Sequence, residues 1–72
     1  GISNSFTISY YNAPANGTVV FEDLTAPNTF NTVLDATGFG IANVYLQTPI
    51  GDHQIKVTFS DGHVQNYIIN VT

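Results

Sequence analysis

The chain has 72 residues, which make one small domain near the lower limit for a self-sufficient core, and it has no Cys for a disulfide or a thiolate metal site. Only 8% of its residues are charged, and Lys56 is the only base against five acidic residues, for a formal net charge of −4. Displacing counterions from phosphates takes several Lys or Arg residues, so this composition excludes nucleic acids and anionic membrane surfaces as partners, and no apolar run is long enough to span a bilayer.

Short runs of β-branched and aromatic residues, separated by clusters of Gly, Pro, Asn and Asp, are typical of strands joined by turns. In chain order the expected strands cover residues 5–11, 18–23, 30–34, 39–47, 53–59 and 63–71. Successive side chains of a strand point to opposite faces, so the core face is expected to carry every second residue. Val19 and Phe21 are expected to point inward, and Ile55, Val57 and Phe59 form the clearest core face. Phe6, Ile8 and Tyr10 share one face of the first strand, and Ala42, Val44 and Leu46 share one face of the fourth.

The last two expected strands are joined by Asp61-Gly62, which is a strong hairpin signal because both central positions of a two-residue turn need φ above zero. A turn of this length fixes the register of the two strands. The predicted pairs are Phe59 with Val64, Val57 with Asn66, Ile55 with Ile68, and Lys56 with Tyr67.

Six strands without a helix predict an all-β fold, either an antiparallel sandwich or a small barrel. A single flat sheet would leave a large apolar face in water, so the strands are expected to form two layers. We expect one domain over residues 1–72.

Three stretches, residues 17–23, 35–38 and 50–59, together resemble the immunoglobulin-like repeat domains of large bacterial and archaeal surface proteins. Those repeats contain a Gly-Thr-Val-x-Phe strand, an Asp-x-x-Gly-x-Ala turn and strand, and a Pro-x-Gly-x-His/Tyr-x-Ile-x-Val-x-Tyr/Phe strand. The resemblance covers residues 5–72. It implies an immunoglobulin-like sandwich of six or seven strands, an extracellular location at the cell surface, and a spacer, adhesin or filament role without catalytic residues.

The sequence departs from this pattern at its start, because such domains usually begin with another edge strand and only residues 1–4 precede the first expected strand. An open sheet edge is a template for pairing with a neighbour. Either the fold does without that strand, or the cut was made there, or another chain supplies it. The last alternative is the hypothesis that the domain polymerises by accepting a strand from an adjacent subunit.

Few residues of the sequence are candidates for metal binding or catalysis. His53 and His63 lie at opposite ends of the predicted hairpin, roughly 23 Å apart at strand spacing, so they cannot share a metal within one chain and are expected to be structural. Asp61 is expected to favour the backbone conformation of the turn and to have no catalytic role. Asp23 and Asp35 could share a calcium ion only if their loops lie at one end, and turn capping is the favoured alternative. No catalytic residue, metal or cofactor is expected.

The sequence raises two kinds of covalent modification. A Lys–Asn/Asp isopeptide bond would need a buried Lys, but Lys56 alternates out of phase with the apolar residues around it. Asn16 and Asn70 begin Asn-x-Thr sequons, which makes them glycosylation candidates. Asn16 is the better candidate because it stands in a Pro- and Gly-containing loop.

The tyrosines are the candidate contact residues. Tyr11, Tyr45 and Tyr67 are expected on an exposed face, which could pack on another subunit or stack on sugar rings. Two functions follow: a non-catalytic structural module that contacts copies of itself or neighbouring domains, and alternatively a carbohydrate- or protein-binding module.

Overall fold

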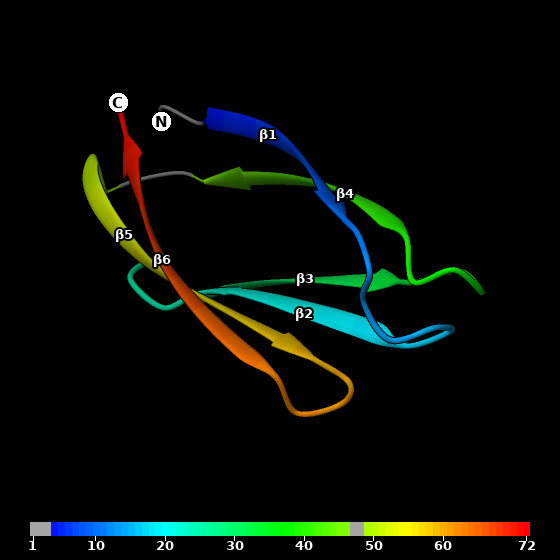
Figure 1. The fold of residues 1–72 in the computed structure, drawn as a ribbon. Helices are drawn as coiled ribbons and strands as arrows, with labels where there is room; N and C mark the ends of the chain where they lie inside the picture. Colours follow the sequence, from blue (N-terminus) through cyan, green and yellow to red (C-terminus); the bar gives the residue numbers. More distant parts are fainter. Residues whose placement is uncertain (1–3, 47–48) are drawn as a thin grey trace.

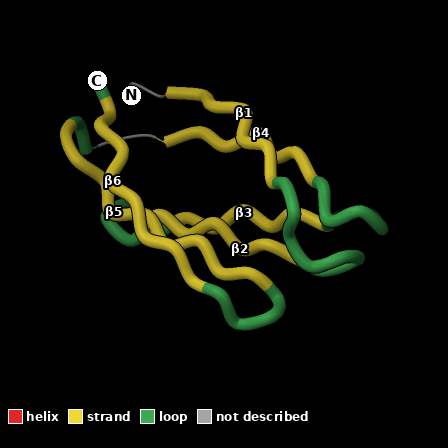
Figure 2. The backbone as a smooth tube through the Cα atoms, in the orientation of Figure 1, coloured by secondary structure: helices red, strands yellow, loops and turns green. Residues whose placement is uncertain are grey.

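The computed structural model describes residues 4–46 and 49–72, and the regular structure in these residues is entirely β-strand (Figure 2). The strands are β1 (Asn4–Tyr10), β2 (Thr18–Asp23), β3 (Asn28–Val33), β4 (Gly40–Leu46), β5 (Gly51–Phe59) and β6 (Val64–Val71). All six predicted strands are present with ends within two residues of the prediction, although Gln47 lies outside the described residues. The described part of the chain holds no helix with the length and hydrophobicity needed to cross a membrane.

The strands form two antiparallel sheets that face each other, as in Figure 1. The smaller sheet contains β1 and β4, and the larger sheet has the order β3-β2-β5-β6. Every pairing between neighbouring strands is antiparallel. The all-β class and the small antiparallel sandwich predicted from the sequence are therefore confirmed.

The core lies between the sheets and is built from alternate residues of the strands, as the alternation predicts. The fully buried apolar side chains include Val19, Val44, Leu46, Ile55 and Val71. Phe6, Ile8, Phe59 and Ile69 are half-buried and pack against this core. The exposed or half-buried residues between them, such as Thr18 and Glu22, lie on the outer faces.

The two long sides of the sandwich differ. On one side β4 approaches β3, and the rings of Phe30 and Tyr45, with centroids 5.4 Å apart, bridge the two sheets. On the other side β1 and β6 are both edge strands, each with a described partner on only one of its edges. We call this second side, bounded by β1 and β6, the open side.

The β5–β6 hairpin differs from the predicted register by one residue. Ile55 lies opposite Tyr67 rather than Ile68, and Lys56 lies opposite Asn66 rather than Tyr67. A shift of one residue exchanges the two faces of a strand. The register prediction was therefore wrong, and as a result Ile68 is exposed on the outer face while Tyr67 turns toward the inner face.

The cause of this shift is a loop of three residues, 60–62, instead of two. The N–H of Gly62 donates to the carbonyl of Phe59 at 2.9 Å, and the N–H of Phe59 donates to the carbonyl of His63 at 2.8 Å. Gly62 has a φ of 93°, whereas Asp61 has no positive φ. This is the pattern of a three-residue hairpin loop, in which an ordinary turn is followed by a left-handed residue.

Candidate binding groove

The acidic residues do not assemble a metal site. The described residues contain no group of three or more His, Cys, Asp or Glu side chains that could hold an ion. Asp23 ends β2 opposite Asn28, whereas Asp35 follows the far end of β3, so the two lie at opposite ends of that hairpin. Each carboxylate instead accepts hydrogen bonds within its own turn, from the N–H of Thr25 at 3.0 Å and from the N–H of Thr37 at 2.8 Å. The condition for a shared calcium ion is therefore not met.

The one titratable pair in the interior of the described residues is His53 with Asp23. The two side chains come from β5 and β2, and the residues are 0% and 2% exposed. His53 Nδ1 lies 2.6 Å from a carboxylate oxygen of Asp23, and Nε2 lies 2.5 Å from the carbonyl oxygen of Pro49. With an ionised Asp23 both partner atoms are acceptors, and the imidazolium form of His53 can donate to both of them at once. The geometry therefore favours the charged form of His53, in a buried pair that serves the structure.

These contacts make the stability of the domain depend on pH. The Pro49 carbonyl, followed by the Asp23 carboxylate, raises the pKa of His53 above its ordinary value, although burial acts in the opposite direction. A raised pKa in the folded state stabilises the fold fully below the unfolded pKa of about 6.5, and this stabilisation is lost as the pH rises through the folded pKa. We therefore expect the free energy of unfolding, measured with urea, to fall between pH 6 and the alkaline range.

The second histidine supplies a matched control for this prediction. His63→Gln should keep the fall of stability with pH, because His63 is exposed beside the β5–β6 loop. His53→Gln should flatten the same curve. A curve unaffected by His53→Gln would show that the buried imidazolium is absent.

The other candidate residues of the β5–β6 hairpin, His63 and Lys56, make contacts that serve the structure. The ring centroid of His63 lies 5.7 Å from that of Phe59, and the backbone N–H of His63 donates to the Asp61 carboxylate at 2.9 Å. Because His53 is at the other end of β5 with both nitrogens engaged, the two histidines share no site. Lys56 is half-buried on the outer face of the larger sheet, opposite Glu22, as its alternation predicts.

The two glycosylation candidates differ in accessibility. Asn16 is exposed in the loop between β1 and β2 and has a left-handed φ of 57°. Asn70 is exposed on β6, but its side-chain amide donates a hydrogen bond to Asp52 at 3.0 Å. Asn16 therefore offers the more accessible amide.

The three candidate contact tyrosines do not share one face. Tyr45, 49% exposed, lies on the side where β4 approaches β3. Tyr11, 70% exposed, and Tyr67, 49% exposed, both line a groove on the open side. The structure therefore brings two of the three together.

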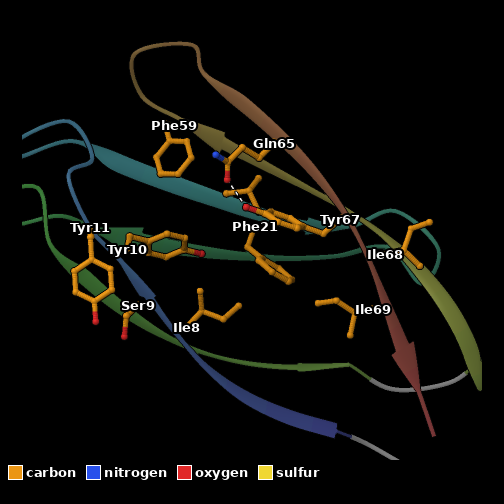
Figure 3. A pocket seen from close by; sticks show the side chains of 11 residues that line it. Ile8, Ser9, Tyr10, Tyr11, Phe21, Phe59, Gln65, Tyr67, Ile68 and Ile69 are labelled. Atoms are coloured by element: carbon orange, nitrogen blue, oxygen red, sulfur yellow. Dashed lines mark hydrogen bonds between the residues drawn. The ribbon is translucent and has the colours of Figure 1, made fainter.

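The groove runs between the two sheets along the open side and holds about 460 Å³ (Figure 3). None of the residues that line it is charged. Its walls and floor include Ile8, Tyr10, Phe21, Phe59, Tyr67 and Ile69. The groove is thus an uncovered continuation of the apolar core, with one strand edge on either side.

One buried side-chain polar atom in the groove lacks a hydrogen-bond partner among the described residues. The hydroxyl of Tyr10 is buried and makes no hydrogen bond, and the whole residue is only 8% exposed. Burial, followed by the nearby Tyr67, raises the pKa of the Tyr10 hydroxyl. An unsatisfied buried hydroxyl costs roughly 1–3 kcal/mol, so a polar group that entered the groove would recover this free energy.

The edges that border the groove are unprotected. Proteins usually guard an edge strand with charged residues, proline or a bulge. Neither β1 nor β6 contains a charged residue or a proline. Both edges are therefore suited to pairing with another strand.

Comparison of the chain with known proteins found no matching family model, no matching curated protein and no matching solved structure. The function is therefore argued from the groove and its two edges.

Proposed function

We propose that this chain is a non-catalytic structural module of an extracellular surface assembly, such as a filament, an adhesin array, a stalk or a surface layer. It acts through contacts between domains and between strand edges. The observation that carries the proposal is the open side, where two unguarded edges flank an uncharged groove. An extended peptide segment with apolar side chains at alternate positions would pair with a strand edge through its backbone and fill the groove with its side chains.

The surroundings of the buried pair support a non-catalytic role. A general acid or base must reach the proton that it transfers. Both ring nitrogens of His53 are occupied by Asp23 and Pro49, and the side chain has no exposed surface. The pair is therefore suited to holding β2 against β5.

The composition supports the proposed location by association. A chain with 8% charged residues has a surface built mainly from Asn, Thr, Ser and Gln, which is common in cell-surface and filament proteins. The accessible sequon at Asn16 is compatible with such a location.

The test compares two tyrosines with the same exposure on opposite sides of the sandwich. Tyr67→Lys places a charge in the groove, whereas Tyr45→Lys places it where β4 approaches β3. An unpaired charge buried in an interface costs about 2–5 kcal/mol, so Tyr67→Lys should raise the dissociation constant of self-association by about 30-fold or more. Light scattering over a range of protein concentrations measures this.

The control variant Tyr45→Lys should associate as the unchanged protein does. Circular dichroism verifies that both variants keep the β fold. Equal effects of the two substitutions, or an unchanged protein that is monomeric at every concentration, would contradict the proposal.

Carbohydrate binding is the second candidate function, because Tyr11 and Tyr67 expose their rings at the same groove. Tyrosine combines an apolar ring with a polar tip, and such rings stack on sugars. Binding of an isolated monomer to a glycan array, weakened by Tyr11→Ala and kept by Tyr45→Ala, would favour this function over assembly.

A further inference from the structure

The strand β6 is exposed on both of its faces over most of its length, unlike β4, whose inward residues are buried. Val64, Tyr67 and Ile68 are large apolar side chains that remain exposed on β6. Successive residues of a strand point to opposite faces, so Tyr67 stands on the inner face of the sheet and Ile68 on the outer face. A strand added at the free edge of β6 would contact both faces at once.

The hydrogen bonds at the end of the hairpin show which backbone groups of β6 face this free edge. The N–H of Phe59 donates to the carbonyl of His63 at 2.8 Å, so these two residues form a hydrogen-bonded pair in line with the β5–β6 ladder. Hydrogen-bonded and non-hydrogen-bonded pairs alternate along an antiparallel ladder. The odd-numbered residues of β6 therefore bond to β5, and the even-numbered residues turn their N–H and C=O groups outward. These outward residues are Val64, Asn66, Ile68 and Asn70.

The opposite edge of β5 gives the same assignment. The N–H of Leu24 donates to the carbonyl of Gln54 at 2.9 Å, in line with the β2–β5 ladder. By the same alternation, the even-numbered residues of β5 bond to β2 and its odd-numbered residues bond to β6. Each odd-numbered residue of β5 lies opposite an odd-numbered residue of β6, such as Ile55 opposite Tyr67. The two ladders therefore agree.

We propose that β6 pairs along its free edge with β6 of a second copy of this chain, as an antiparallel neighbour across a twofold axis. The two four-stranded sheets then become one continuous sheet. The partner suits the edge because the outward backbone groups of both copies belong to even-numbered residues, which face each other when a strand pairs antiparallel with itself. The proposal rests on the proposed function and adds the identity of the partner and its arrangement.

The backbone groups also select the register. With the twofold axis at Tyr67, Val64 lies opposite Asn70 of the second copy, and Asn66 lies opposite Ile68 of the second copy. Every outward residue of β6 then has a partner. With the axis at Asn66 or at Ile68, an outward residue would instead lie beyond the end of the partner strand.

The exposed apolar side chains fit this register on both faces. On the inner face, Tyr67 lies opposite Tyr67 of the second copy in a non-hydrogen-bonded pair, in which Cα atoms are about 4.5 Å apart. Aromatic pairs across neighbouring strands are stabilising. On the outer face, Ile68 is the diagonal neighbour of Ile68 of the second copy, a separation that long side chains can bridge. Each of these two residues therefore meets its own counterpart.

The charge distribution permits the contact, although each copy has a net charge of −4. No residue of β6 is charged, and the one acid of β5 is Asp52, which lies opposite Asn70 and accepts a hydrogen bond from its amide. In the proposed register Asn70 lies opposite Val64 of the second copy, and Val64 lies opposite Thr58 of its own chain. No acid of one copy therefore meets an acid of the other across the paired strands. A contact in which each edge is used twice closes on itself, so it produces a dimer and leaves the β1 edges free.

Asn66→Pro tests the pairing without removing a hydrogen bond between β6 and β5. Proline has no backbone N–H, and the N–H of Asn66 faces the free edge, where proline is tolerated in a strand. The variant should raise the dissociation constant of self-association at least tenfold, measured by light scattering over a range of protein concentrations. The matched control Asn66→Ala keeps the N–H and should associate as the unchanged protein does. Circular dichroism verifies that both variants keep the β fold.

Disulfide cross-linking tests the register, because the chain has no Cys of its own. Tyr67→Cys should form a covalent dimer on oxidation, since Cα atoms about 4.5 Å apart lie within the range of about 4.4–6.8 Å that a disulfide requires. Gln65→Cys is the matched control on the same face. In this register Gln65 lies opposite Ile69 of the second copy, so its own two copies stand four residues apart, or about 13 Å along the strands. Gln65→Cys should therefore form little disulfide alone but a mixed disulfide with Ile69→Cys, which mass spectrometry identifies.

The outcomes separate the two proposals. Association that persists in Asn66→Pro but is lost in Tyr67→Lys, including masses that grow beyond two copies as expected for strands donated at β1, would overturn the pairing of β6 while assembly through the open side stands. Homodimers of Gln65→Cys as abundant as those of Tyr67→Cys would overturn the arrangement across the twofold axis at Tyr67. An unchanged protein that is monomeric at every concentration would overturn both proposals.

Discussion

Replacing His53 by leucine is expected to lower the free energy of unfolding by about 3–5 kcal/mol, because it leaves the Asp23 carboxylate buried without its cation. The Pro49 carbonyl loses its donor in the same step. Leucine fills a similar volume, so most of the loss comes from the uncompensated charge. Urea unfolding followed by circular dichroism measures the change.

A domain of this length has a total stability of about 4–11 kcal/mol, so the variant can lie close to the unfolding threshold. If it is unfolded in water, the loss can be measured in an osmolyte such as sucrose, which favours the compact state of both proteins. An unchanged free energy of unfolding in either solvent would contradict the buried ion pair.

The double variant His53→Leu with Asp23→Asn distinguishes the cost of the unpaired Asp23 charge from the cost of changed side-chain packing. Asparagine keeps the oxygen that accepts from the Thr25 N–H, but it removes the negative charge. The double variant should therefore be more stable than His53→Leu alone. Asp23→Asn by itself should cost only about 1 kcal/mol, because a neutral His53 can accept from the new amide and still donate to Pro49.

The alternation of side chains along the strands could be predicted from the sequence. It also places two polar residues on inner faces, which the core prediction did not include. Asp23 has the same phase as Val19 and Phe21, and His53 has the same phase as Ile55 and Val57. Phase alone therefore places both polar side chains on inner faces. Their meeting depends on the pairing of β2 with β5, which connects residues 30 positions apart in the chain. A local pattern does not specify such a pairing.

The register of the last hairpin could not be predicted from Asp61-Gly62 alone. The dipeptide fits a two-residue turn, but it also fits a three-residue loop that begins at Ser60 and needs only Gly62 in the left-handed region. The choice between these loops decides whether Tyr67 or Ile68 faces inward. Because Tyr67 faces inward, the groove has a tyrosine wall that the predicted register did not contain.

The division of six strands into sheets of two and four could not be predicted either, because both layers show the same alternation. The resemblance to immunoglobulin-like repeats indicated an open edge at the first strand, and β1 is an edge strand of the described residues. That a neighbouring subunit donates a strand there stays a prediction, as does the resemblance itself. The groove on the open side becomes apparent only from the three-dimensional arrangement.

Gly38→Ala is expected to cost about 2–5 kcal/mol, combining a left-handed backbone with a close contact. Gly38 has a φ of 78°, and an added Cβ would lie 2.0 Å from the carbonyl oxygen of Ala13. That oxygen belongs to the backbone of the β1–β2 loop, which is held against Gly38 by a hydrogen bond from the Ala13 N–H at 3.1 Å. The loop must therefore move before the substitution fits. Urea unfolding measures the loss.

Gly62→Ala is the matched control for this substitution. Gly62 has a φ of 93°, but an added Cβ would meet no atom within 4 Å, so this variant should lose only about 1–2 kcal/mol from the strained backbone. The difference between the two variants isolates the contact between the β3–β4 loop and the β1–β2 loop, which links the ends of the two sheets. If the two variants lose the same free energy of unfolding, the two loops do not pack against each other. Only the apolar core would then hold the two sheets together at this end.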